Sequence, residues 1–146
     1  MSTPEQPKQS AATHGGKPKI LVADDDGTMR TFIRAVLSSD YDLVEAADGR
    51  QAIEILDTVE DIVGVISDDR MPHASGFEVS AHVRDTERLS GIPVILMTAK
   101  ETSSPSRQAE SRMAGAAAFL NKPFTRTQLQ VLLGMLVKLG PVRKSA

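Results

Sequence analysis

The sequence contains no cysteine, which excludes disulfide bonds, thiolate zinc sites and a cysteine nucleophile. No apolar run approaches the roughly 20 residues needed to span a bilayer, and residues 1–16 lack the apolar core of a secretory signal. A large excess of charge is also absent. Seventeen Lys and Arg residues face 19 Asp and Glu residues, a formal net charge of −2 that argues against binding to a nucleic-acid backbone. These absences predict a soluble, cytoplasmic protein with no nucleic-acid or membrane partner.

The chain has 146 residues, of which 40% are hydrophobic and 25% charged, a balance typical of one globular domain. Residues 1–16 are polar and rich in Pro, Ser, Gln and Gly, and this composition predicts a mobile N-terminal tail. Residues 140–146 begin with Gly-Pro and predict a short C-terminal tail. The folded domain is therefore expected over residues 17–139.

Within that domain, short apolar runs alternate with segments whose apolar residues recur at helical spacing. Strands are predicted at 19–23, 41–46, 62–67, 92–98 and 116–120. Helices are predicted over 29–37, 52–59, 77–84 and 103–114, and the last one follows a capping box formed by Thr125 and Gln128. Five strands alternating with five helices predict an α/β fold, with a parallel sheet covered by helices on both faces.

Polar residues gather where the predicted strands end, at the edge where an open parallel sheet carries its site. They are Asp24, Asp25 and Asp26 after the first strand, Asp68 and Asp69 after the third, Thr98 at the end of the fourth, and Lys122 after the fifth. Converging carboxylates repel one another unless a cation lies among them, and oxygen ligands favour Mg²⁺. A nearby lysine suits a phosphate. The pattern predicts a phosphoryl-transfer site in which an aspartate is the nucleophile.

Four segments resemble the receiver domain of bacterial two-component response regulators. They are LVADDD (21–26), SDDRMP (67–72) with a later Gly76, LMTAK (96–100) and FLNKPF (119–124). The segment DDDGTMR (24–30) is most similar to chemotaxis-type, single-domain receivers. The resemblance implies a stand-alone receiver with a doubly wound, flavodoxin-like sheet of five parallel strands in the order 2-1-3-4-5.

The resemblance also implies roles for individual residues. Asp68 would be the phospho-acceptor, and Mg²⁺ would be held by Asp24, Asp25 and Asp68 together with the backbone carbonyl of Arg70. Lys122 would pair with a phosphoryl oxygen, and its bond to Pro123 would be cis.

A second set of implied roles concerns switching and the lifetime of the phosphoryl group. Thr98 would be the switch hydroxyl, and Phe119 would occupy the aromatic switch position. Arg70 and Lys100 are basic at positions that vary in the family, and we expect them to modulate how fast water reaches the acyl phosphate.

The implied function is to accept a phosphoryl group from a histidine kinase or a histidine phosphotransfer protein. The protein would catalyse only its own phosphorylation and dephosphorylation, so it would not be an enzyme acting on a foreign substrate. Its output would reach a downstream protein through the face formed by the fourth helix, fifth strand and fifth helix, as a monomer or a phosphorylation-dependent dimer.

Two other classes of function remain open at this point. The run from Asp24 to Thr28 also spells the DxDGT motif of haloacid-dehalogenase-type phosphatases, with Asp24 as nucleophile and Asp26 as acid, although no acidic residue follows Lys122 as that family requires. The second alternative is a docking module that does not depend on phosphorylation. Asp26 is also expected to cap the first helix, and Arg30 and Arg34 to form a solvated face or help dock a kinase.

Overall fold

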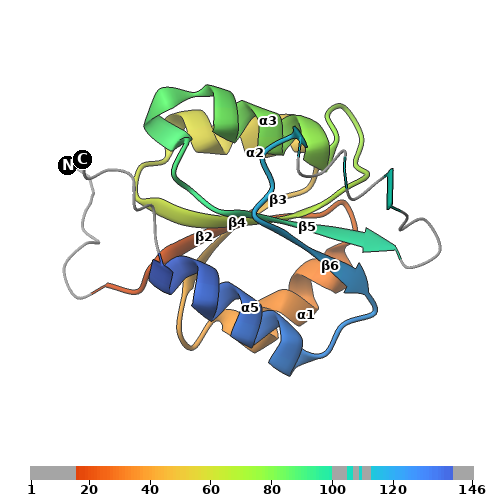
Figure 1. The fold of residues 1–146 in the computed structure, drawn as a ribbon. Helices are drawn as coiled ribbons and strands as arrows, with labels where there is room; N and C mark the ends of the chain where they lie inside the picture. The colour runs from red at the N-terminus through yellow and green to blue at the C-terminus, as the bar shows by residue number, and fades with distance from the viewer. Residues whose placement is uncertain (1–15, 100–104, 107–108, 110–112, 140–146) are drawn as a thin grey trace.

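The protein, described here by a computed structural model, folds into a five-stranded parallel sheet between two layers of helices (Figure 1). The structure describes residues 16–99, 105–106, 109 and 113–139. The strands are β2 (Lys19–Ala23), β3 (Asp42–Ala46), β4 (Ile62–Asp68), β5 (Val94–Ala99) and β6 (Ala118–Lys122). The helices are α1 (Gly27–Leu37), α2 (Gly49–Thr58), α3 (Gly76–Asp85), the 3₁₀ helix η1 (Glu87–Leu89) and α5 (Arg126–Leu139).

The strand order is β3-β2-β4-β5-β6, and every pair is parallel. Counted along the chain, this is the order 2-1-3-4-5, so the predicted doubly wound fold is confirmed. Helices α2 and α3 cover one face of the sheet, and α1 and α5 cover the other (Figure 1). Among the described residues, no helix has the length and apolarity needed to cross a membrane.

Both faces of the central strands are buried, which explains why their sequences are apolar runs and do not alternate. Side chains along a strand point to opposite faces in turn. Leu21 therefore joins the apolar cluster under α2 and α3, while Ile20 and Val22 join the cluster under α1 and α5. The first strand begins and ends where the sequence predicts, at Lys19 and Ala23.

Side-chain caps fix where the helices begin, and they satisfy backbone N–H groups that have no partner within the helix. The predicted cap of α1 is present, since the Asp26 side chain accepts a hydrogen bond from the Thr28 amide. The predicted capping box before α5 is also present. Thr125 Oγ1 accepts from the Gln128 amide at 3.0 Å, and Gln128 Oε1 accepts from the Thr125 amide at 2.8 Å.

Two strand boundaries differ from the prediction for identifiable reasons. β5 begins at Val94 and not at residue 92, because Pro93 has no N–H to donate to a neighbouring strand. β6 runs from Ala118 to Lys122, two residues later than predicted, because Asn121 and Lys122 pair in register with Thr98 and Ala99. Thus Lys122 lies in the last strand and does not follow it.

Two further predictions fall largely or wholly on residues that the structure does not describe. Of the helix expected over 103–114, four described residues are helical: Pro105, Ser106, Ala109 and Met113. Residues 1–15 and 140–146, which make up the two predicted tails except for Gly16, lie outside the described residues.

Candidate functional site

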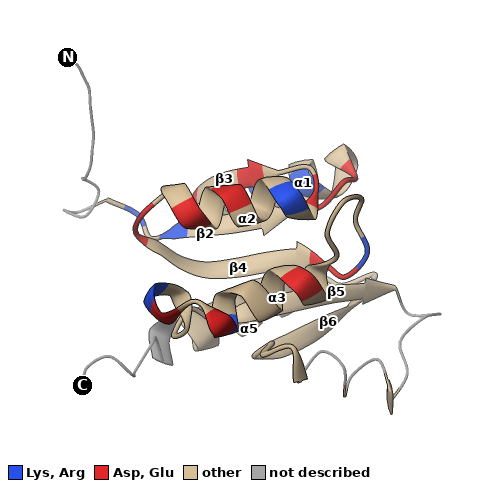
Figure 2. Ribbon diagram, turned by 90° about the horizontal axis from the view of Figure 1, so that it is seen from above, with Lys and Arg blue, Asp and Glu red and all other residues tan. Residues whose placement is uncertain are grey.

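The candidate site lies at the carboxyl edge of the sheet, where β2 and β4 end side by side. β4 has no charged residue before its carboxyl end, where the ribbon is red for an acidic residue (Figure 2). The charged residue is Asp68, the last of β4, and Asp24 follows directly after β2. Because Ala23 pairs with Ser67 across the two strands, the register brings the two aspartates together.

Three carboxylates meet at this edge. Oxygen atoms of Asp24, Asp25 and Asp68 all lie within 4.8 Å of one another. Asp24 is fully buried and Asp68 is 9% exposed, whereas Asp25 is exposed to solvent. Lys122 Nζ reaches into the group from β6, at 3.3 Å from Asp68 Oδ1 and 3.6 Å from Asp24 Oδ2. The structure therefore brings together four of the residues predicted for the site.

Burial and mutual repulsion perturb these groups in the expected directions. Burial raises the pKa of Asp24 above its usual value, against the hydrogen bond from the Asp26 amide and the attraction of Lys122. Burial and then the charge of Asp24 raise the pKa of Asp68 to about 6. Burial alone would lower the pKa of Lys122, but the attraction of Asp68 and Asp24 outweighs it and leaves that pKa raised.

The donor set fits a hard divalent cation. Its ligand atoms are all oxygens, which Mg²⁺ prefers, and their spread is near the roughly 4 Å between opposite ligands in Mg²⁺ coordination. When all four groups are ionised, three carboxylates and one ammonium leave a formal charge of −2. Asp24 Oδ2 is buried with no hydrogen-bond partner, so one acceptor in the site is left for a ligand. A bound Mg²⁺ would cancel this charge.

Thr98 and Phe119, the predicted switch residues, lie on the neighbouring strands β5 and β6. Thr98 is buried, and its hydroxyl donates a hydrogen bond to Asn121 Oδ1 at 2.8 Å. Phe119 is partly buried and packs against the apolar cluster under α2 and α3. In this structure, therefore, the hydroxyl of Thr98 is engaged by β6 and not by the acidic group.

The loop after β4 carries the remaining predicted residues on this side. Arg70 is exposed, while Asp69 before it is only 2% exposed. Gly76 ends the loop: a Cβ there would lie 2.1 Å from the Asp68 carbonyl oxygen, so only glycine fits so close to β4.

The peptide bond between Lys122 and Pro123 is cis, as the resemblance implies. Lys100 lies outside the described residues.

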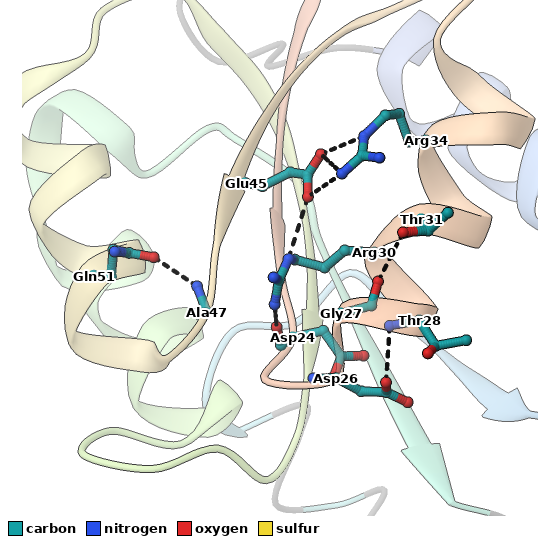
Figure 3. A network of polar contacts seen from close by, with 10 residues as sticks. All are labelled: Asp24, Asp26, Gly27, Thr28, Arg30, Thr31, Arg34, Glu45, Ala47 and Gln51. Atoms are coloured by element: carbon teal, nitrogen blue, oxygen red, sulfur yellow. Dashed lines mark hydrogen bonds and ion pairs between the residues drawn. The ribbon is translucent and has the colours of Figure 1, made fainter.

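Sequence reasoning missed the charged group beside the site. Arg30 and Arg34, expected to form a solvated face, both bind the carboxylate of Glu45 on β3, and Arg30 also donates to the backbone carbonyl of Asp24 (Figure 3). Asn121 was missed as well, because it lies outside the predicted strand. A single acidic residue within the otherwise apolar stretch LVEA was the only available signal for the Glu45 group.

Residues 20–133 match the family model described as the response regulator receiver domain. The match covers more than half of the chain, so the chain belongs to the family of response regulator receiver domains.

Individual relatives agree with this assignment. The chain is 34% identical over 122 residues to chemotaxis protein CheY1 of Helicobacter pylori, covering 80% of this chain and 97% of that protein. It is 30% identical over 125 residues to two-component response regulator ORR5 of rice (Oryza sativa subsp. japonica), covering 85% of this chain and 92% of the relative.

Solved structures share the fold. Chemotaxis response regulator CheY4 of Vibrio cholerae superimposes with a TM-score of 0.75 at 30% identity, covering 82% of this chain and 98% of that one. The receiver domain of the sensor histidine kinase PA1611 from Pseudomonas aeruginosa also gives a TM-score of 0.75, at 27% identity, covering 84% and 99% respectively. That structure contains a magnesium ion coordinated in its active-site cleft.

Proposed function

We propose that this protein accepts a phosphoryl group on Asp68 from the phosphohistidine of a histidine kinase or a phosphotransfer protein, in a Mg²⁺-dependent reaction. The observation that carries the proposal is the acidic group itself. Two buried carboxylates lie together and share one ammonium group, and Asp24 Oδ2 accepts no hydrogen bond. Such an arrangement is costly without a ligand, and it suits a divalent cation and a phosphoryl group.

Asp24, Asp25 and Asp68 would hold the cation, together with the backbone carbonyl of Arg70. The magnesium-containing receiver from Pseudomonas aeruginosa supports this choice of metal. When bound, Mg²⁺ would supply positive charge to the equatorial phosphoryl oxygens. With a pKa of about 6, Asp68 is mainly ionised at neutral pH and so is available as a nucleophile.

In the transfer, an Asp68 carboxylate oxygen forms a bond to phosphorus as the bond between phosphorus and the histidine nitrogen breaks. The ring nitrogen keeps the electron pair and leaves as imidazole. Lys122, whose Nζ lies 3.3 Å from Asp68 Oδ1, would pair with a phosphoryl oxygen and stabilise its charge during transfer. The partner supplies the phosphoryl group, and this protein supplies the charges around it.

The output in this proposal is a change in the population of two conformations. The Thr98 hydroxyl would leave Asn121 and bind the phosphoryl group, and Phe119 would move inward. These changes would alter the surface expected from the predicted fourth helix, β6 and α5, which would bind the downstream protein. Arg70 and Lys100 would modulate how long the phosphoryl group persists.

The test is the intact mass of the protein after incubation with Mg²⁺ and a small acyl phosphate. The wild type should gain the mass of one phosphoryl group, and Asp68→Asn should gain none. Asp26→Asn is a matched control, because it changes a carboxylate at the same edge whose side chain caps α1. It should be phosphorylated like the wild type, since asparagine also caps helices.

Other outcomes would contradict the proposal. An adduct that disappears in Asp24→Asn but persists in Asp68→Asn, with release of inorganic phosphate, would indicate a phosphatase using Asp24. No adduct on the wild type at any Mg²⁺ concentration would favour a docking module that does not depend on phosphorylation.

A further inference from the structure

Arg30 on α1 connects β3 to the backbone of the acidic site. Its Nε donates to Glu45 Oε1 at 3.2 Å, and its Nη1 donates to the backbone carbonyl of Asp24 at 2.5 Å. Figure 3 shows the guanidinium group lying between the two acceptors. The side chain is only 23% exposed, so it is held in this position on several sides.

The Asp24 carbonyl belongs to the peptide group that joins Asp24 to Asp25. A peptide group is planar, so a hydrogen bond that fixes its carbonyl also fixes the direction in which the Asp25 backbone leaves it. On the other side of Asp24, its amide donates to the Ala46 carbonyl at 3.1 Å. The neighbouring β3 residues Glu45 and Ala46 therefore control both peptide groups of Asp24, one through Arg30 and one directly.

The positive charge of Arg30 does not by itself explain why the residue lies beside the acidic site. A cation beside a Mg²⁺ site would repel the metal, but Glu45 accepts a hydrogen bond from Arg30 and two from Arg34. The carboxylate of Glu45 thus offsets one of the two positive charges beside the site. What reaches the site is a fixed hydrogen bond to the Asp24 backbone carbonyl, which orients the ligand residues through their backbone, as outer residues orient metal ligands through their side chains.

We propose that Arg30 is a positioning residue for Mg²⁺, which holds the peptide between Asp24 and Asp25 so that both carboxylates face the metal. This inference rests on the proposed function only in that Asp24 and Asp25 hold the metal. Arg30 touches neither the cation nor the phosphoryl group.

Arg34 provides a matched control from the same helix. It lies one turn further along α1 and donates to Glu45 at 2.7 and 2.8 Å, with half of its side chain exposed. Arg34→Met and Arg30→Met both keep an unbranched apolar stem, remove one guanidinium group and break a bond to Glu45. They differ in that Arg30→Met also releases the Asp24 carbonyl.

The experiment is a titration of the ¹⁵N-labelled protein with MgCl₂, followed by amide chemical shifts and without a phosphodonor. Arg30→Met should raise the Mg²⁺ dissociation constant about tenfold, and Arg34→Met should stay within twofold of the wild type. Before Mg²⁺ is added, the Asp25 amide should shift in Arg30→Met and remain unchanged in Arg34→Met. Arg30→Lys should give an intermediate affinity, because one ammonium group cannot reproduce the fork that binds Glu45 and the carbonyl together.

Thermal unfolding of each variant separates positioning from a structural role. If both Met variants lose similar stability and Mg²⁺ affinity does not distinguish them, the inference is wrong and Arg30 only braces α1 against β3. If Arg30→Lys binds Mg²⁺ with the wild-type dissociation constant, a positive charge is sufficient and the paired guanidinium contact with Glu45 and the Asp24 carbonyl is not needed. The inference is then again wrong. If the wild type itself binds no Mg²⁺, the metal part of the proposed function fails together with the inference.

Discussion

Glu45 lies on β3 and Asp24 directly follows the neighbouring strand β2, but the two carboxylates differ in the number of positive groups beside them. Glu45 is one carboxylate that binds two guanidinium groups, and both of its oxygens accept hydrogen bonds. Asp24 is one of three carboxylates that lie near a single ammonium group, and its Oδ2 is buried with no hydrogen-bond partner. A group in which both carboxylate oxygens are hydrogen-bonded within the fold, as in Glu45, is structural. A group with excess negative charge and a buried oxygen that accepts no hydrogen bond is suited to binding a cation.

Of the changes considered at the acidic site, removal of the Lys122 ammonium group should have the largest effect on phosphorylation. We expect Lys122→Met to slow phosphorylation by a small acyl phosphate about 100-fold or more, because the developing phosphoryl charge loses a fixed cation. The Mg²⁺ dissociation constant should not rise, since the variant site carries more negative charge. Phosphorylation rates from intact mass, beside a Mg²⁺ titration, measure both quantities.

Lys19→Met is the control for this variant, because Lys19 lies at the amino end of β2, away from the acidic edge. It should phosphorylate at the wild-type rate. A Lys122→Met rate within fivefold of the wild type would show that the ammonium group only offsets the carboxylates in the resting protein.

Because Asp68 is buried beside Asp24, the metal-free protein should also become less stable as pH rises. The folded pKa of Asp68 is about 6, above its usual value of 3.8, so the folded state binds more protons than the unfolded state between these values. Stability therefore falls as pH rises from about 4 to 6 and then levels off. In EDTA, Asp68→Asn should be more stable than the wild type by about 3 kcal/mol at pH 7 and equal to it near pH 3.

Urea unfolding at a series of pH values measures this difference. Adding Mg²⁺ should stabilise the wild type by mass action and have less effect on Asp68→Asn. A stability difference that is the same at pH 3 and pH 7 would contradict the view that the charge of Asp68 is costly in the folded protein.

The smallest expected effect concerns Asn121, which engages the Thr98 hydroxyl at 2.8 Å. One hydrogen bond contributes about 1 kcal/mol. Asn121→Val should therefore lower the concentration of beryllofluoride, a phosphoryl mimic, needed for half-saturation by up to about fivefold, because Thr98 no longer has to leave a partner. Amide chemical shifts report the binding.

A double-mutant cycle isolates this contribution. In a Thr98→Ala background, Asn121→Val should change the affinity for the mimic very little. An equal effect with and without the threonine hydroxyl would show that Asn121 acts on the site by another route.

The two charged groups also differ in how much of each can be predicted from the sequence. The strand order is implied by the resemblance to receiver domains. The parallel sheet, the first strand and the meeting of Asp24 with Asp68 are predictable from residue patterns, because buried strands are apolar and carboxyl ends of parallel strands share an edge. These features depend on patterns local in sequence.

The Glu45 group depends on contacts between residues 11 and 15 positions apart in the chain, so the lone acidic residue in LVEA does not by itself reveal its partners. Arg30 and Arg34 have the spacing of a solvated helix face, and only the pairing of β3 with β2 places Glu45 beside them. The extent of β6 was missed for a related reason. Polar Asn121 and Lys122 look like loop residues, yet backbone pairing with β5 keeps them in the strand.

The most direct test of the central claim is the position of the phosphoryl group itself. The phosphorylated protein would be treated with borohydride, which reduces an aspartyl phosphate to homoserine, and peptides would then be sequenced by tandem mass spectrometry. The account predicts homoserine at position 68 in samples phosphorylated with Mg²⁺, and none in samples treated with EDTA. Homoserine at position 24, or none at position 68 in a protein that has gained the phosphoryl mass, would contradict it.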